Sequence, residues 1–358
     1  MSISSGPTSS GPISSGPDFP RTIDAVDTDW LTATLGVDVV GLTSTHIGEG
    51  VGLLGDIYRL TLTYGDGAEG PPTLILKFPT TAPEYRGVAD ALAYFTREVQ
   101  FYQRAAADAP FNTGKCHLAV MADDSTDFVL VLEDLSYLTA PDQLEGLSAT
   151  QAEAAITSIA KHHAQWWNHD DLAELELPYL PVAADIYQAV LPDMFRASWA
   201  ACKAAVPELV AHPEVSAFGD RYAELIPTMM PSIDQPRTWV HGDLRADNLM
   251  FGADGAPTML DFQIMGQSVG TYDVAYLMSQ SVPVEIRRNH EDTIVRAYHQ
   301  QLVDSGVTDY SWEQCWEDYR LCLAFCLIYP VTGYDKLDEL NERGRALIDT
   351  MLERSVQA

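Results

Sequence analysis

The sequence predicts an α+β fold, in which a β-rich first lobe precedes a mainly helical second lobe. Strand-like runs dominate the first third of the chain: residues 56–64 alternate in polarity, and residues 74–78 and 128–133 are short apolar runs. Helical patterns dominate after Asp134, and a short β-rich island over residues 238–263 interrupts them. Strands gathered ahead of helices are typical of α+β architectures.

Within the first lobe, we expect three strands, one helix and two further strands. A short helix over residues 24–35 precedes them, and the long helical pattern covers residues 85–107. In the second lobe, Ser148 and Gln151 have the spacing of a capping box, which predicts a helix that runs to about His169.

Three parts are expected along the chain. The tetrapeptide SSGP recurs within the first residues, so we assign residues 1–20 to a disordered Ser/Gly/Pro arm. Residues 21–134 then form the N-lobe and residues 135–358 the C-lobe. A length of 358 residues suits two lobes.

Composition narrows the class of protein. No apolar run approaches the length of about 18 residues that a membrane span needs, and the N-terminus lacks a signal-like apolar segment, so we expect a cytoplasmic protein. The net charge of −30 argues against nucleic acid or an anionic membrane as a partner. It suits a cationic substrate or, as we favour, an acidic surface that serves solubility.

The cysteines fit a reduced compartment. Cys315, Cys322 and Cys326 recur on one face of a predicted helix among apolar residues, so we interpret them as core residues and not as metal ligands. The pairs His162-His163 and Trp166-Trp167 are likewise interpreted as one packed helix face.

The most specific motif is WVHGDLRADNLMF, in which Asp243 is followed five residues later by Asn248. A second carboxylate, Asp261, ends a later apolar run. Transfer of a phosphoryl group from Mg-ATP needs a carboxylate base beside the acceptor hydroxyl and separate oxygen ligands for Mg²⁺. Asp243 suits the base, and Asn248 and Asp261 suit the metal. Arg245 is placed to stabilise the moving phosphate. The alternative is a surface turn, where Asp, Gly and Asn are common.

Residues 50–55 have the pattern GxGxxG through Gly50, Gly52 and Gly55. In dinucleotide-binding folds this motif opens a helix. Here an alternating strand pattern follows, so we expect a β-hairpin whose loop covers phosphates. A plain glycine-rich turn is the alternative.

Lys77 lies inside the apolar run LILKF, where an unpaired charge is costly. A strand lysine that reaches the α/β-phosphates and is held by a helix glutamate would explain it. Glu98 is the preferred partner and Glu84 the reserve, while a lysine that reaches the lobe surface is the alternative. The strand that ends at Glu133 is positioned for its backbone to bind an adenine edge.

In this order, the motifs resemble the aminoglycoside phosphotransferase-like kinases, which include choline kinases. The similarity spans residues 47–277 and is greatest to the ecdysteroid kinase-like branch, which shares the LDFQ form at Asp261. It implies a protein-kinase-like two-lobe fold, ATP and Mg²⁺ as cofactors, Asp243 as the base and Asn248 and Asp261 as metal ligands. It also implies that Lys77 binds phosphate beside Glu98 and that Asp273 braces the catalytic loop. Two departures are Gln263, where protein kinases have Gly, and a loop tip without Ser.

We therefore expect a kinase of a hydroxylated small molecule, such as an aminoglycoside, an amino sugar or a sterol-like alcohol, acting as a monomer or homodimer. The alternatives are a nucleotide-binding pseudokinase without catalysis, and a protein kinase or nucleotidyl transferase. All four positions that carry phosphoryl-transfer chemistry (Lys77, Asp243, Asn248 and Asp261) are occupied by suitable residues, which argues against a pseudokinase. The acceptor, the oligomeric state and the choice between ATP and GTP are left open.

Overall fold

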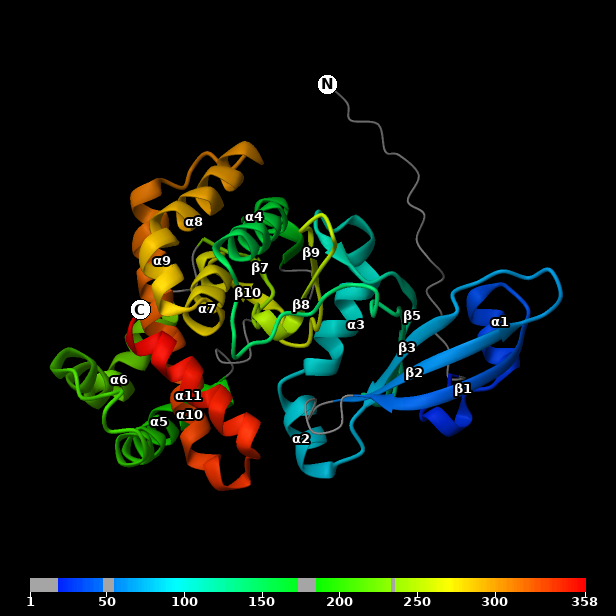
Figure 1. The fold of residues 1–358 in the computed structure, drawn as a ribbon, viewed down its shortest axis with the longest axis horizontal. Coiled ribbons are helices and arrows are strands. Elements are labelled where there is room, and N and C mark those ends of the chain that lie inside the picture. Colours follow the sequence, from blue (N-terminus) through cyan, green and yellow to red (C-terminus); the bar gives the residue numbers. More distant parts are fainter. Residues whose placement is uncertain (1–18, 48–54, 173–184, 233–235) are drawn as a thin grey trace. The chain divides into compact units, whose positions relative to one another are not determined.

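The computed structural model describes residues 19–47, 55–172, 185–232 and 236–358, and it divides the chain into two compact units. The first comprises Met1–Ala109 and Thr113–Tyr137, and the second comprises Pro110–Asn112 and Leu138–Ala358 (Figure 1). The predicted SSGP arm and most of the GxGxxG segment lie outside the described residues.

A five-stranded antiparallel sheet, in the order β1-β2-β3-β6-β5, forms the first unit. Side chains alternate across β3: Leu74, Leu76 and Phe78 enter an apolar cluster with Leu31 of α1, whereas Lys77 faces α3 on the other side. The strands of this sheet are β1 (Val39–Ile47), β2 (Gly55–Tyr64), β3 (Thr73–Pro79), β5 (Cys116–Met121) and β6 (Phe128–Glu133). The helices of the unit are η1 (Ile23–Ala25), α1 (Thr28–Leu35), α2 (Pro83–Ala91), α3 (Tyr94–Arg104) and η2 (Ala106–Asp108).

The single helix expected over residues 85–107 is wrong, because the structure has two helices there, α2 and α3. The chain turns at Ala93, whose φ of 57° lies in the left-handed region. Buried Arg97 donates from Nε to the Leu92 carbonyl at 3.0 Å and so satisfies a backbone acceptor at the end of α2. Burial lowers the pKa of Arg97 to about 10.

The second unit is mainly helical. Its α-helices are α4 (Ala149–Gln165), α5 (Asp185–Ala205), α6 (Pro213–Ser232), α7 (Thr271–Ser281), α8 (Val284–Asp304), α9 (Trp312–Cys326), α10 (Ile328–Gly333) and α11 (Glu342–Val356). Its short 3-10 helices are η3 (Asp170–Leu172), η5 (Ala246–Asn248) and η6 (Tyr334–Glu339). The β-rich island supplies β7 (Thr238–Val240), β8 (Leu249–Phe251), β9 (Pro257–Met259) and β10 (Gly266–Ser268), and β4 (Asn112–Thr113) lies where the two units meet in sequence. Every residue of α7 is buried, so this helix is the centre of the unit.

The capping box at Ser148 and Gln151 is confirmed, since both of its hydrogen bonds form. The helix ends at Gln165 and does not reach His169. Asn168 explains the early end: its φ is 48°, and it exchanges two hydrogen bonds with the backbone of Arg237. The chain is thereby turned toward β7.

The cysteines are free, and Cys315, Cys322 and Cys326 are buried, as expected for core residues. Burial raises the pKa of Cys315 to about 12, so this thiol stays protonated. Among the described residues, no group of three His, Cys, Asp or Glu side chains could hold a metal ion. None of the described helices is long and apolar enough to cross a membrane.

His162 of α4 is fully buried among aromatic rings. Its ring lies 5.2 Å from that of Phe111, edge to face, and 5.8 Å from that of Trp239. The pKa of His162 lies well below its ordinary value, because burial disfavours the imidazolium and because His163 and His241 are close. The native protein therefore holds this side chain neutral.

Stability should consequently fall in mild acid. Below about pH 6.5 the unfolded chain binds a proton at His162 that the native state does not, which costs at most about 1.4 kcal/mol per pH unit. We expect His162→Leu to flatten this dependence in urea unfolding measured between about pH 7 and pH 5. His290→Gln, at an exposed position, is the control and should keep the wild-type slope. An unchanged slope in His162→Leu would contradict the assignment.

Candidate active site

Two short strand pairs hold the residues of the HGDLRADN motif. β7 pairs with β10, and β8 pairs with β9, both antiparallel. The 241–248 loop connects β7 to β8, and residues 260–265 connect β9 to β10. Of these strands, β7 and β9 pack against α4 (Figure 1). Pairing in this order places the segment that carries Asp243 beside the segment that carries Asp261.

The backbone of the 241–248 loop is held by Asp273 of α7, whose side chain is fully buried. Its Oδ2 accepts the amide N–H of His241 at 2.7 Å, and its Oδ1 accepts that of Gly242 at 2.9 Å. Gly242 has a φ of 85°, a conformation that glycine adopts without strain. The bracing role predicted for Asp273 matches this geometry.

The carboxylate of Asp273 also contacts His163 of α4. His163 Nε2 lies 3.1 Å from Asp273 Oδ2, and its Nδ1 lies 3.0 Å from the hydroxyl of Tyr298. Gly270, at the start of α7, leaves space for both side chains: a Cβ at this position would clash with the Tyr298 hydroxyl and lie 2.8 Å from His163 Nδ1.

His241 joins the two loops. Its Nδ1 accepts the amide N–H of Asp243 at 3.3 Å, so its Nε2 carries the proton and donates to the Leu260 carbonyl at 2.9 Å. The Leu260 amide in turn donates to the carbonyl of Asn248 at 3.0 Å. His241 therefore packs beneath the loop and links it to the segment that carries Asp261.

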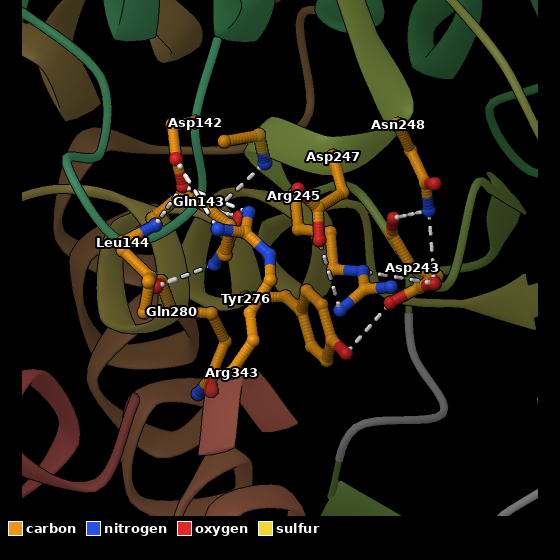
Figure 2. Close-up of polar contacts among 12 residues, drawn as sticks. Asp142, Gln143, Leu144, Asp243, Arg245, Asp247, Asn248, Tyr276, Gln280 and Arg343 are labelled. Atoms are coloured by element: carbon orange, nitrogen blue, oxygen red, sulfur yellow. Dashed lines mark hydrogen bonds and ion pairs between the residues drawn. The ribbon is translucent and has the colours of Figure 1, made fainter. Parts of the chain in front are cut away.

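The carboxylate of Asp243 is enclosed by donors, as Figure 2 shows. Tyr276 of α7 donates its hydroxyl to Oδ1 at 2.7 Å, and Asn248 donates from Nδ2 to Oδ2 at 2.9 Å. Asn248 Nδ2 also donates to the Asp243 carbonyl at 2.9 Å. Because the amide nitrogen makes these bonds, the side-chain oxygen of Asn248 is directed away from Asp243.

Arg245, the residue predicted to stabilise the moving phosphate, lies among carboxylates. Its Nε is 3.4 Å from Asp243 Oδ2, and its Nη1 is 3.7 Å from Asp247 Oδ2 (Figure 2). The pKa of Arg245 is raised by Asp243 above all, against the effect of burial, with smaller contributions from Asp247 and Asp261. The guanidinium is therefore a fixed positive charge beside Asp243.

Asp261 lies two residues beyond the end of β9 and has a φ of 61°, which is unusual for a residue other than glycine. Strained backbone of this kind often marks functional positions. Asn248 and Asp261 both present oxygen donors, and the Leu260 amide ties their segments together. One amide and one carboxylate, completed by phosphate oxygens and water, suit Mg²⁺ better than a site made of protein ligands alone.

A third anchor for the loop comes from the end of α7. Ser281 Oγ accepts the amide N–H of Ala246 at 2.9 Å and donates to Gln143 Oε1 at 3.1 Å. Arg354 of α11 donates to the carbonyls of Gln143, Leu144 and Gln280 (the last of these from α7), each at 2.8–2.9 Å. Sequence reasoning missed Tyr276 and Ser281. Their spacing from Asp273 along one helix is the signal that was available.

In the first unit, Lys77 and Glu98 meet as predicted. Lys77 Nζ lies 2.9 Å from Glu98 Oε1 and 2.8 Å from Oε2, and both side chains are buried. Gly55 begins β2 beside this lysine, because a Cβ there would lie 3.1 Å from Lys77 Cε. Gly50 and Gly52 lie outside the described residues, although the flanking strands β1 and β2 pair as a hairpin requires. The side chain of Glu84 also lies outside them.

Glu133, predicted at the adenine edge, ends β6. Its amide donates to the Lys115 carbonyl at 2.9 Å, and its carboxylate accepts the Lys115 amide and the Tyr137 hydroxyl. The adenine contact remains a prediction.

The fold is that of the protein-kinase-like small-molecule phosphotransferases. The chain is similar to the choline kinase LicA from Streptococcus pneumoniae (TM-score 0.50, 13% identity, 92% of this chain and 98% of that chain). It is also similar to an ethanolamine kinase from Plasmodium vivax (TM-score 0.51, 12% identity, 88% and 81%). A third similar structure is an aminoglycoside 2'-phosphotransferase-IIIa with GDP (TM-score 0.51, 13% identity, 88% and 92%).

Residues 49–307 match the ecdysteroid kinase-like family, and the chain belongs to that family. No curated protein matches its sequence. The similarity to aminoglycoside phosphotransferase-like kinases, expected from the motifs, is therefore confirmed at the level of family and fold.

The buried ion pair of the first unit should be strongly coupled. Lys77→Met leaves Glu98 buried without this counter-ion, and we expect it to cost about 3–5 kcal/mol of unfolding free energy. The double variant Lys77→Met/Glu98→Leu should recover most of the loss, because two apolar side chains of similar volume need no partner. Urea unfolding of the wild-type protein, of Lys77→Met, of Glu98→Leu and of the double variant measures the coupling.

Arg196→Met, which breaks the exposed pair of Arg196 and Asp193, serves as the control and should change little. Additive losses from the two substitutions in the first unit would contradict the pairing.

Proposed function

We propose that this chain is an ATP-dependent phosphotransferase that moves the γ-phosphate onto a hydroxyl of a small molecule. The observation that carries the proposal is the 241–248 loop. It presents the carboxylate of Asp243 and the amide of Asn248 together, and it is tied through Leu260 to the segment of Asp261. A surface turn, the alternative for this motif, does not need a buried carboxylate such as Asp273 to hold its backbone.

In the proposed reaction, Asp243 accepts the proton of the acceptor hydroxyl as that O–H bond breaks. The acceptor oxygen then forms a bond to the γ-phosphorus, the bond from this phosphorus to the bridging oxygen breaks, and its electron pair leaves with ADP. Arg245 holds its positive charge next to this centre and stabilises the transferring group. Asn248 and Asp261 would hold Mg²⁺, which supplies neutralisation of phosphate charge when bound.

In the first unit, Lys77 is proposed to bind the α- and β-phosphates. The Glu98 carboxylate orients the ammonium by two short contacts. Gly55, Gly52 and Gly50 would cover the phosphates through backbone amides. Glu133 would mark the strand end that reads adenine.

The acceptor is proposed to be a hydroxylated small molecule of the kinds that the resemblance implies: an aminoglycoside, an amino sugar, a choline-like alcohol or a sterol-like alcohol. The net charge of −30 supports a cationic acceptor. The family to which the chain belongs supports a sterol-like one. A screen should therefore include both chemistries, with ATP and GTP as donors.

Asp243→Asn should lower kcat by at least about a hundredfold, because the variant loses the proton acceptor while the loop keeps its amide and carbonyl contacts. Nucleotide binding should survive. Phosphate release from Mg-ATP and transfer to the screened alcohols are the measurements, and Asp254→Asn, in the exposed turn between β8 and β9, is the matched control. Wild-type turnover in Asp243→Asn would remove this residue from the mechanism.

Asp261→Ala should instead weaken nucleotide binding when magnesium is present. The melting temperature of the wild-type protein should rise with Mg-ATP by mass action, and this rise should shrink in Asp261→Ala while the smaller effect of ATP with a chelator is retained. The same experiment tests the function: no shift of the wild-type protein at millimolar nucleotide would contradict the kinase proposal. A shift without turnover of any acceptor would favour the pseudokinase.

A further inference from the structure

The carboxylate of Asp243 also makes a contact with a residue outside the 241–248 loop. Its Oδ1 accepts the hydroxyl of Tyr276 at 2.7 Å, whereas its Oδ2 faces Asn248 and Arg245 (Figure 2). The two oxygens therefore have different surroundings. A carboxylate can rotate about its Cβ–Cγ bond, and donors on both oxygens prevent that rotation.

Tyr276 is well placed to fix this carboxylate because of its position on α7. It lies three residues after Asp273, so both side chains leave the same face of one helix. Asp273 holds the backbone of the 241–248 loop, and Tyr276 holds the side chain that the loop presents. The helix is buried along its whole length, so these two points have a fixed separation.

The ring of Tyr276 is itself held by other tyrosines. Tyr329 packs edge to face on it with ring centres 5.0 Å apart, and Tyr272 stacks on it at 6.1 Å. The hydroxyls of Tyr272 and Tyr329 are hydrogen-bonded to each other. Burial, above all, and the neighbouring Asp243 raise the pKa of Tyr276 well above its ordinary value, so its hydroxyl stays protonated and can donate.

We propose that Tyr276 is a positioning residue for catalysis: it locks the Asp243 carboxylate in the orientation that receives the proton of the acceptor hydroxyl. The inference rests on the proposed function, since it assumes that Asp243 is the base. Each carboxylate oxygen has two lone pairs. One on Oδ1 is occupied by Tyr276, so the directions left for the acceptor proton are restricted to a defined part of the site.

Tyr276→Phe keeps the ring and its packing and removes the hydroxyl. We expect kcat for phosphate release from Mg-ATP, and for transfer to any alcohol accepted in the screen, to fall about ten- to a hundredfold, since small misplacements of a reacting group have effects of this size. The KM for Mg-ATP should stay within about twofold, because no contact with nucleotide is removed. In the Asp243→Asn background, Tyr276→Phe should cause no further loss, because there is no base left to position.

Tyr319→Phe is the matched control. Its hydroxyl donates to the carboxylate of Glu291 at 2.7 Å, so it loses a tyrosine–carboxylate bond of the same length elsewhere in the second unit. Melting temperatures of the two variants separate a change in folding from a change in catalysis. An equal fall of kcat in both variants, or an unchanged kcat in Tyr276→Phe, would overturn the inference, as would a further full loss in the Asp243→Asn background.

These results are distinguishable from failure of the proposed function. If the wild-type protein neither releases phosphate nor phosphorylates any alcohol, the kinase proposal fails and this inference fails with it. If the wild-type protein turns over and Tyr276→Phe matches it, the inference alone fails.

Discussion

Asp273 carries a carboxylate from which solvent is excluded, and its two oxygens accept backbone N–H groups from His241 and Gly242 while also contacting His163. A buried charge is tolerated where hydrogen bonds replace water, and here the donors belong to the 241–248 loop. The loop therefore cannot change its path without leaving a carboxylate unsatisfied. Helix α7 therefore fixes the path of the loop through Asp273. Side chains later in the same helix make further contacts with the loop.

The same logic extends along α7. Ser281 accepts the amide of Ala246 and is linked through Gln143 to Arg354, whose guanidinium binds three backbone carbonyls. The loop is thus held by one helix at its beginning, at the side chain of Asp243 and near its end. Although the loop is irregular, these contacts fix the positions of its side chains as a helix or strand would.

Local patterns predicted much of the fold and the site. The lysine inside the apolar run LILKF predicted a buried charge that needs a partner, and the spacing of Asp243 and Asn248 predicted that they belong to one site. These features depend on neighbours in sequence. The break at Ala93 and the early end of α4 could not be read in the same way, because each depends on a hydrogen bond to a particular backbone carbonyl or amide. Tyr276 was hidden for a related reason: nothing in a buried helix distinguishes a tyrosine that packs from one whose hydroxyl reaches a distant carboxylate.

Gly270 contacts neither the proposed base nor a proposed metal ligand, but it bears on the same loop. Its missing side chain makes the space in which Tyr298 and His163 stand behind Asp273. Even a methyl group would push on that pair, and the displacement would pass through one carboxylate to the loop. A natural variant at this glycine would consequently lower turnover as a substitution in the 241–248 loop would. Two layers of side chains nevertheless separate the glycine from that loop.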